Sequence, residues 1–250
     1  LLMTWTVTYE IARYKPGEPP RTDTFKVEIE PHRTVLDGIE MIWAYQDRTL
    51  TFRHACHHAS CGSCAFVVNG VEVLPCIVEI QSVVENGGTL RCEPLYSFPV
   101  VSDLVVDMGP FFEKMRMMEM PIITPTGPLP QQPADDYNRF ENCIECGMCM
   151  SACPVVATDP NYLGPAPLAA AHRIIQRPDI PEETKQRIWE LVDSDNGLWR
   201  CHVAMECTAV CPSDVDPGGK IMDLRRLATA NRIRKLLGLK PKLPVGVEDA

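Results

Sequence analysis

Residues 143–154 of the chain read Cys-Ile-Glu-Cys-Gly-Met-Cys-Met-Ser-Ala-Cys-Pro. Two, two and three residues separate the successive cysteines, and a proline follows the last one. This spacing is typical of a run that binds iron–sulfur clusters in pairs, in which the fourth cysteine of one run ligates the other cluster. The stretch therefore predicts a second run of the same form elsewhere in the chain.

The second run lies at residues 201–212 and contains one replacement. Alanine stands at its second cysteine position, as Ala204. Crossed ligation assigns one [4Fe–4S] cluster to Cys143, Cys146, Cys149 and Cys211. The remaining cysteines of the two runs are Cys153, Cys201 and Cys207. Because alanine cannot bind iron, we expect these three to hold a [3Fe–4S] cluster. A four-iron cluster with one water-ligated iron is the second interpretation.

Another cysteine group lies in the N-terminal half, where residues 56, 61, 64 and 76 are cysteines. The spacing of Cys56, Cys61 and Cys64, followed by Cys76, is of the plant-type ferredoxin kind and predicts a [2Fe–2S] cluster. Gly62 would let main-chain N–H groups point at the cluster sulfurs. Zinc is a weaker alternative, because zinc sites favour paired Cys-x2-Cys motifs and this group has only one.

Three histidines crowd the same loop: His54, His57 and His58. A Rieske-type site would use two histidines as ligands, but four cysteines are already available. We therefore interpret the histidines as loop surface that could face a partner subunit. Cys92 stands in a predicted strand without a matching cysteine, and we interpret it as a small buried hydrophobic residue.

Composition excludes several classes of protein. The chain has 250 residues, 12 cysteines and a net charge of −9. Its length permits a buried core without disulfides, and we see no secretory leader. The negative charge argues against nucleic acid as a partner, and no apolar run reaches the roughly 18 residues of a membrane span. No Ser–His–Asp set, P-loop or Gly-x-Gly-x-x-Gly motif occurs, so we expect no catalytic residue in this chain.

Hydrophobic periodicity outlines the secondary structure of the N-terminal half. Alternation predicts strands at residues 4–14, 25–29, 65–68, 71–73 and 89–94. Thr34 is expected to cap a helix whose apolar residues are Leu36, Ile39, Ile42 and Trp43. Asn69-Gly70 predicts a tight hairpin turn, and residues 102–118 are expected to be helical.

A proline-rich stretch separates the two halves. Residues 121–134 contain five prolines and little periodicity, which indicates an extended linker. Beyond it, helical patterns are expected at residues 168–176, 181–192 and 220–237. The sequence thus predicts an α+β protein with a strand-rich domain at 1–120, the linker at 121–134 and a helical two-cluster domain at 135–250.

With these motifs in place, the chain resembles the iron–sulfur subunit of succinate dehydrogenase and fumarate reductase over essentially its whole length. The matching pieces are the three cysteine groups, residues 98–107, Gly164-Pro165-Ala166 and Cys201-His202. The resemblance implies an N-terminal β-grasp plant-type [2Fe–2S] ferredoxin domain and an α-helical bacterial-ferredoxin-like domain. It also implies two kinds of partner, a flavoprotein subunit that carries FAD and a membrane anchor of one or more subunits, with or without heme.

The resemblance further implies a route for electrons, from FAD through the [2Fe–2S], [4Fe–4S] and [3Fe–4S] clusters to menaquinone or ubiquinone at the subunit interface. The chain would then lie peripherally on the cytoplasmic face of the cell membrane, or on the matrix face of the mitochondrial inner membrane. The alternative is a subunit of a soluble, thiol-linked fumarate reductase or of another three-cluster dehydrogenase.

By position in the family, the candidate quinone contacts are Pro154, His202, Val203 and, more weakly, Arg225. His202 is also the candidate proton relay, because imidazole titrates near neutral pH; a histidine merely packed beside a cluster cysteine is the alternative. Many ubiquinone-linked relatives carry aromatic residues after this Cys-Pro, whereas residues 155–159 here read Val-Val-Ala-Thr-Asp. We therefore expect menaquinone.

Charge is segregated toward the C-terminus. Residues 217–242 contain eight lysines and arginines and one acid, a net charge of +7, while the rest of the chain carries −16. Such segregation predicts contact with an anionic membrane surface or with the anchor subunit, a solvated helix face being the alternative. Neutralising Arg232, Arg234 and Lys235 is expected to weaken assembly or membrane attachment.

Overall fold

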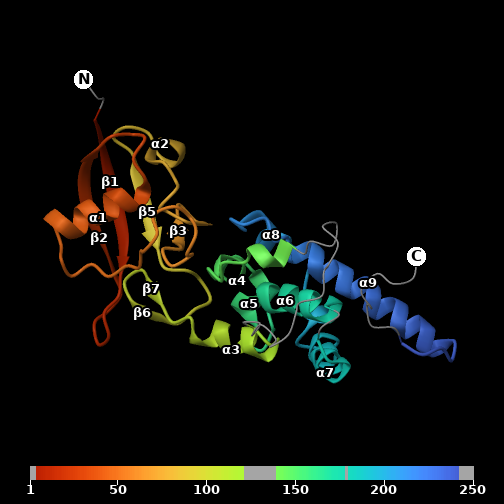
Figure 1. Ribbon diagram of the computed structural model, residues 1–250. Coiled ribbons are helices and arrows are strands. Elements are labelled where there is room, and N and C mark those ends of the chain that lie inside the picture. The colour runs from red at the N-terminus through yellow and green to blue at the C-terminus, as the bar shows by residue number, and fades with distance from the viewer. Residues whose placement is uncertain (1–3, 121–138, 178–179, 242–250) are drawn as a thin grey trace. The chain divides into compact units, whose positions relative to one another are not determined.

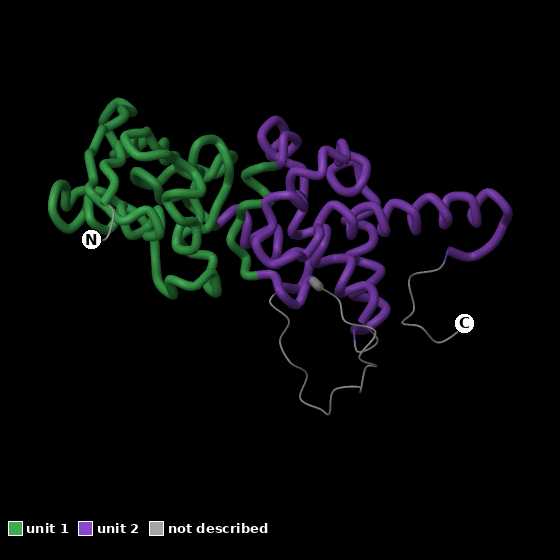
Figure 2. The backbone as a smooth tube through the Cα atoms, turned by 90° about the horizontal axis from the view of Figure 1, so that it is seen from above, with its two compact units in different colours: residues 1–108, 144–152 green, residues 109–143, 153–250 purple. Residues whose placement is uncertain are grey.

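The computed structural model describes residues 4–120, 139–177 and 180–241. The chain forms two compact units (Figure 2): unit 1 comprises residues 1–108 and 144–152, and unit 2 comprises residues 109–143 and 153–250. Residues 144–152 thus belong to unit 1 although most of the C-terminal half belongs to unit 2. The predicted linker at 121–134 lies outside the described residues, and the predicted domain boundaries stay predictions.

Unit 1 is built on a five-stranded mixed sheet of order β2-β1-β5-β3-β4 (Figure 1). Its strands are β1 (Trp5–Arg13), β2 (Arg21–Ile29), β3 (Phe66–Val68), β4 (Val71–Val73) and β5 (Thr89–Glu93). β1 pairs antiparallel with β2 and parallel with β5, so it occupies the inside of the sheet. β3 and β4 form the predicted hairpin across Asn69 and Gly70, both with positive φ. The short helix α2 (Ile80–Val83) leads toward β5.

The core of unit 1 lies between this sheet and helix α1 (Val35–Tyr45). Alternate residues of β1 are fully buried: Val7, Tyr9 and Ile11. Thr34 and Asp37 form a reciprocal capping box that fixes the start of α1. A Cβ on Gly38 would lie 2.0 Å from the Tyr9 hydroxyl oxygen, so only glycine lets the helix approach the sheet this closely.

A buried ion cluster closes one end of the sheet. The Arg13 guanidinium is fully buried and lies 2.8 Å from Asp23 and 2.6 Å from Asp47. Its Nε lies 3.2 Å from Asp103, which is also fully buried and accepts hydrogen bonds from Lys15 and from the Thr51 N–H. The cluster therefore ties β1 to the segment of residues 47–53, which leads into the cysteine loop.

The predicted helix at residues 102–118 is wrong in its first third. The structure has the strand β6 (Val100–Ser102), the strand β7 (Val105–Val106) and only then the helix α3 (Gly109–Met117). β-Branched valines favour the two-stranded ribbon, and Asp103 turns the chain with a φ of +46°. The buried Asp103 carboxylate accepts hydrogen bonds from Lys15 and from the Thr51 N–H, and these bonds hold the turn. Helical periodicity cannot indicate such contacts.

Unit 2 is helical, and α6 (Pro165–Gln176) lies at its centre, buried from Pro165 to Ile175. Helices α7 (Glu182–Val192) and α9 (Pro217–Leu236) pack against α6. The short elements are η2 (Arg139–Asn142), α5 (Pro154–Thr158), η3 (Leu198–Arg200) and α8 (Glu206–Ala209), while α4 (Met148–Ser151) belongs to unit 1. The three predicted helices are confirmed, with α6 and α9 beginning three residues earlier, at prolines suited to a first turn.

Candidate metal centres

The cysteine loop of unit 1 wraps main-chain donors around one sulfur. The N–H groups of His58, Ser60 and Cys61 lie 3.5, 3.3 and 3.4 Å from Cys56 Sγ. Positive φ at His57 and Ala59 turns these N–H groups inward. The donors, the His58 N–H foremost, lower the pKa of the Cys56 thiol to about 7. The loop therefore stabilises a thiolate, which is the form that binds iron.

The other two cysteines of this set lie deeper. Cys64 and Cys76 are both buried. Burial first, and then the neighbouring Cys76, raise the pKa of the Cys64 thiol to about 12, with a smaller contribution from Cys61. The structure thus brings Cys56 next to Cys61 and Cys64 next to Cys76. Four thiols in one region of unit 1 are a donor set that fits a [2Fe–2S] cluster.

Gly62 of this loop is needed for a close approach. Its φ is +67°, and a Cβ there would lie 2.8 Å from the Cβ of Cys146 and 3.0 Å from the Ile144 carbonyl oxygen. The cysteine loop of residues 56–64 therefore packs against the start of the cysteine run at residues 143–154, within unit 1. A side chain at position 62 would separate the two segments.

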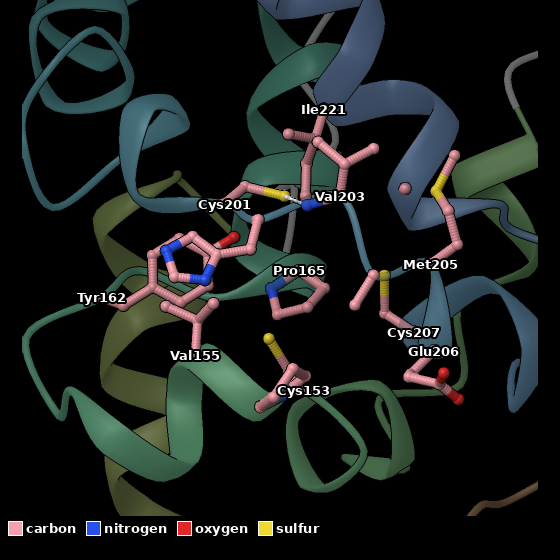
Figure 3. Close-up of a pocket in the computed structure, with 14 residues that line it drawn as sticks. Cys153, Val155, Tyr162, Pro165, Cys201, Val203, Met205, Glu206, Cys207 and Ile221 are labelled. Atoms are coloured by element: carbon pink, nitrogen blue, oxygen red, sulfur yellow. Dashed lines mark hydrogen bonds between the residues drawn. The ribbon is translucent and has the colours of Figure 1, made fainter.

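Three cysteines meet in one pocket of unit 2 (Figure 3). Cys153 precedes α5, Cys201 follows η3 and Cys207 lies in α8. The other lining residues are Pro154, Val155, Tyr162, Pro165, His202, Val203, Ala204, Met205, Glu206, Gly218 and Ile221. The pocket therefore contains the three predicted [3Fe–4S] ligands, the alanine of the second run, and three of the four predicted quinone contacts.

The electrostatics of this pocket favour the binding of metal cations. Burial first, and then Cys153 and Cys201, raise the pKa of the Cys207 thiol to about 12, and burial also raises the pKa of Cys153. Three mutually repelling thiolates in an apolar pocket are unfavourable until iron compensates their charge. The three thiols with Ala204 beside them thus fit a cluster with three protein ligands.

Tyr162 supplies a further sign that a polar group belongs in the pocket. Its side chain is fully buried, and its hydroxyl makes no hydrogen bond of good geometry to any described residue. Lys114 of α3 donates to the main-chain carbonyls of Pro160 and Tyr162 and holds this segment in place. Sequence reasoning missed Tyr162; its position two residues before Gly164-Pro165 was the only available signal. A buried hydroxyl among thiols can donate to a sulfur.

The segment between Cys201 and Cys207 has an unusual backbone. Val203 has a φ of +61° and Met205 a φ of +65°, conformations that side chains, above all β-branched ones, rarely adopt. The Val203 N–H lies 3.4 Å from Cys201 Sγ. Both side chains are exposed, as is that of His202. The loop therefore bends around one sulfur and presents an imidazole and two apolar groups outward.

Arg225 of α9 holds the segment that leads to His202 through hydrogen bonds to its main chain. Its guanidinium donates to the carbonyl of Leu198 at 2.9 and 2.6 Å and also to the carbonyl of Cys201. Arg225 does not line the pocket described above. Its contacts make it a positioning residue for the loop that carries Cys201 and His202.

The predicted [4Fe–4S] ligands are divided between the two units. Cys146 and Cys149 belong to unit 1, and Cys143 and Cys211 to unit 2. Gly147, with a φ of +81°, turns the chain between the first pair, and the Val215 N–H lies 3.4 Å from Cys211 Sγ. This ligand set stays a prediction.

Cys92 lies fully buried in β5, and burial raises the pKa of its thiol, as expected for a small core residue. No disulfide joins any of the twelve cysteines, all of which lie in described residues. Across residues 4–120, 139–177 and 180–241, the structure contains no helix with the length and apolar character of a membrane span.

Comparison with known proteins identifies the two cluster-binding domains of the chain. Residues 8–113 match the family described as a 2Fe-2S iron-sulfur cluster binding domain, and residues 139–215 match the 4Fe-4S dicluster domain. The first match covers most of the mixed sheet, and the second covers the cysteine runs together with α6 and α7. The α+β architecture with a [2Fe–2S] ferredoxin domain followed by a dicluster domain is thus confirmed.

Curated relatives span nearly the whole chain. The fumarate reductase iron-sulfur subunit of Mycobacterium tuberculosis is 34% identical over 92% of this chain and 96% of its own length. The succinate dehydrogenase iron-sulfur subunit of Paracoccus denitrificans is 36% identical over 88% of this chain and 86% of its own length. A chain of the Mycobacterium smegmatis Sdh1 complex in the apo form has 25% identity and a TM-score of 0.74, covering 94% of this chain and 98% of that chain. The protein belongs to the family of iron–sulfur subunits of succinate dehydrogenase and fumarate reductase, and its function is electron transfer within such an oxidoreductase.

Proposed function

We propose that this chain connects a flavoprotein subunit, which carries FAD, to a quinone bound at a membrane anchor. When bound, the three clusters supply one-electron steps in the order [2Fe–2S], [4Fe–4S], [3Fe–4S]. The proposed ligands are Cys56, Cys61, Cys64 and Cys76 for the first, Cys143, Cys146, Cys149 and Cys211 for the second, and Cys153, Cys201 and Cys207 for the third. The observation that carries the proposal is the meeting of the last three cysteines with Ala204 in one pocket.

Ala204 determines the kind of cluster in this proposal. Its methyl group lines the pocket where a fourth thiol would be needed, and it offers no lone pair to iron. Three protein ligands on three irons then satisfy the site, whereas a fourth iron would have to take water. This is why we propose [3Fe–4S] in place of a labile four-iron cluster.

The quinone end follows from the exposed rim of the same pocket. Pro154, His202 and Val203 line it and are exposed, so a flat apolar ring bound there would touch an aliphatic surface and an imidazole. His202 is proposed to pass protons to the quinone oxygen, since imidazole exchanges protons near neutral pH. Arg225 contributes by holding the carbonyl of Cys201 in place. The absence of aromatic residues at positions 155–159, directly after Pro154, supports menaquinone as the partner.

The membrane side of the proposal places the chain on the cytoplasmic face of the membrane, bound to an anchor subunit. Support comes from the basic C-terminal segment and from the relatives' membership in succinate dehydrogenase and fumarate reductase. A soluble, thiol-linked enzyme would not need a surface of this charge.

Electron paramagnetic resonance of the oxidised and then stepwise reduced protein tests the proposal. We expect a three-iron signal in the oxidised sample that disappears on reduction, followed by signals of the reduced [2Fe–2S] and [4Fe–4S] clusters. Ala204→Cys should remove the three-iron signal and add a second reduced four-iron signal. Ala209→Cys, which adds a thiol in α8 outside the pocket lining, is the matched control and should keep the wild-type spectrum. An oxidised wild type without signal, with two four-iron signals on reduction, would overturn the proposal.

A further inference from the structure

A second group of metal-binding side chains lies in unit 1, apart from the cysteines. Glu40 Oε1, His54 Nδ1 and His57 Nε2 form a small triangle. The two ring nitrogens lie 3.0 Å apart, and the carboxylate oxygen lies 3.1 Å from His54 and 3.3 Å from His57. All three atoms thus converge on one point.

A helix and a loop hold these three side chains. Glu40 lies on α1, directly after the fully buried Ile39, and a capping box fixes the start of that helix at Thr34. The His54 ring stacks on Phe52, with ring centroids 5.2 Å apart and planes inclined by 22°. The His57 backbone is in the left-handed region, with a φ of +59°. The convergence therefore does not depend on a single flexible loop.

Glu40 Oε1 is a buried acceptor without a suitable donor. The oxygen atom is inaccessible to solvent and makes no hydrogen bond of acceptable geometry to a described residue, although both nitrogens lie close to it. A buried carboxylate oxygen left in this way costs free energy. A cation at the centre of the triangle would satisfy the oxygen and both ring nitrogens at once.

The spacing also matches metal coordination. Ligand atoms about 2.1 Å from one ion lie about 3.0 Å apart at right angles and about 3.4 Å apart in a tetrahedron, given the usual zinc bond lengths. The three observed separations fall within this range. Two imidazoles and one carboxylate favour Zn²⁺ over Mg²⁺ or Ca²⁺, which prefer oxygen ligands alone.

We propose that Glu40, His54 and His57 form a Zn²⁺ site with three protein ligands. The imidazoles are 42% and 45% exposed, which leaves the remaining coordination position open to water or to an incoming ligand. His58 takes no part, because its Nδ1 contacts the main-chain carbonyl of Cys56. Two of the three crowded histidines thus gain a common role that does not depend on which cluster the neighbouring cysteines bind.

Zinc binding to the full iron-loaded chain tests this site. Anaerobic equilibrium dialysis against Zn²⁺ with metal analysis should give one bound zinc per chain at micromolar free zinc, without loss of iron. Glu40→Gln and His57→Gln should each weaken zinc binding at least about tenfold. His58→Gln removes an imidazole from the same loop and should leave zinc affinity unchanged. Equal affinity in all three variants, or no bound zinc in the wild type, would overturn the proposal.

X-ray absorption at the zinc edge separates this site from zinc captured by cysteines. A shell of nitrogen and oxygen at about 2.0–2.1 Å supports the site, whereas sulfur at about 2.3 Å overturns it. The iron content of the same samples reports independently on the clusters. A failure of the zinc site would therefore leave the proposed electron route untouched.

Discussion

The two cysteine sites that each lie within one unit are built in opposite ways. In unit 1, Cys56, Cys61 and Cys64 come from one short loop, and three N–H groups surround the sulfur of the half-buried Cys56. In unit 2, Cys153 and Cys207 come from distant segments and are buried among apolar side chains. The pKa of the Cys56 thiol is lowered to about 7, whereas that of the Cys207 thiol is raised to about 12. The difference lies between these two positions, because burial also raises the pKa of Cys64 in unit 1 to about 12.

The contrast shows two ways to prepare a cluster site. At Cys56 the loop of unit 1 stabilises a negative sulfur through its own main chain, so the geometry there depends mainly on what anchors the loop. The pocket of unit 2 penalises negative sulfur, so its geometry depends on helices that hold Cys153 and Cys207 together against that penalty. Hydrogen bonds to sulfur and burial are also the two main means by which a protein tunes a cluster's potential.

The largest expected effect comes from breaking the anchor of the unit 1 loop. Arg13→Met leaves Asp103 buried without one of its two cationic partners and frees Asp47, just before the cysteine loop. Removing one partner from a buried ion cluster costs about 3–5 kcal/mol of folding free energy. Denaturant unfolding followed by circular dichroism measures this loss, and visible absorption of the [2Fe–2S] centre should decline with it.

Arg21→Met is the matched control for this prediction. Arg21 lies on the neighbouring strand and pairs with Asp23 and Glu18, but it is 45% exposed. Surface pairs of this kind contribute little. If Arg13→Met and Arg21→Met unfold at the same denaturant concentration, the buried cluster does not anchor the loop.

Acid should destabilise unit 2 more than unit 1, and we expect a smaller loss of folding free energy than for Arg13→Met. His172 of α6 is buried, and this burial, followed by the charge of Lys220, lowers its pKa to about 4 despite the opposing Asp223. The unfolded chain protonates His172 near pH 6.5, whereas the folded chain does so only near pH 4. The contribution of neutral His172 to the stability of unit 2 is therefore fully present above pH 6.5, and it is lost as the pH falls toward 4. Between pH 6.5 and 5 the loss is roughly 2 kcal/mol.

Unit 1 should keep its stability between pH 6.5 and 5. The Thr49 hydroxyl, which donates to Asp47, and the guanidinium of Arg13 lower the pKa of Asp47 to about 2. Its stabilising contribution is therefore complete above about pH 4 and disappears only as the pH falls through 2. Hydrogen–deuterium exchange, corrected for intrinsic rates, should show α6 losing protection between pH 6.5 and 5 while β1 does not. His172→Gln should remove the change in α6; equal loss in both units would contradict the comparison.

Local signals predicted much of the fold from the sequence. Alternation gave the buried face of β1, the Asn69-Gly70 pair marked the hairpin, and Thr34 capped α1 as expected. The prediction failed at residues 102–106, where the turn at Asp103 is held by Lys15 and the N–H of Thr51. Such a turn depends on contacts between residues far apart in the sequence, and no local pattern encodes them.

For the candidate sites too, local sequence patterns predicted some residues and missed others. Spacing predicted that Cys153, Cys201 and Cys207 belong together, and the pocket brings them together. The role of Tyr162 was not predicted, because a tyrosine within a loop carries no sign of its burial. Arg225 was expected near the quinone on the strength of its position, yet it supports the carbonyls of Leu198 and Cys201. Only the packing of α9 against η3 reveals that contact.

The last prediction concerns the basic end of α9. Exposed apolar side chains accompany the basic residues there: Ile233, Leu236, Leu237 and Leu239. Arg232 does not share in this surface, since it pairs with Asp193 and stacks on Trp199. Arg234, another of the basic residues predicted to make this contact, is half-buried and donates to the main-chain carbonyl of Lys240. The exposed charges at this end are Lys235 and Lys240, and their neighbouring leucines suit an anionic lipid surface.

Neutralising these two lysines tests whether the end of α9 contacts lipid. Lys235→Gln with Lys240→Gln should weaken binding to phosphatidylserine-containing vesicles about thirty-fold, since each basic residue near such a surface contributes about 1 kcal/mol. Added salt should shrink the difference, because it screens exposed charge. The matched control is Arg33→Gln with Arg91→Gln, which removes the same charge from exposed positions of unit 1. If both double variants lose the same affinity in vesicle flotation, net charge alone governs binding; if neither loses any, α9 does not meet lipid and its basic end is left to the anchor subunit.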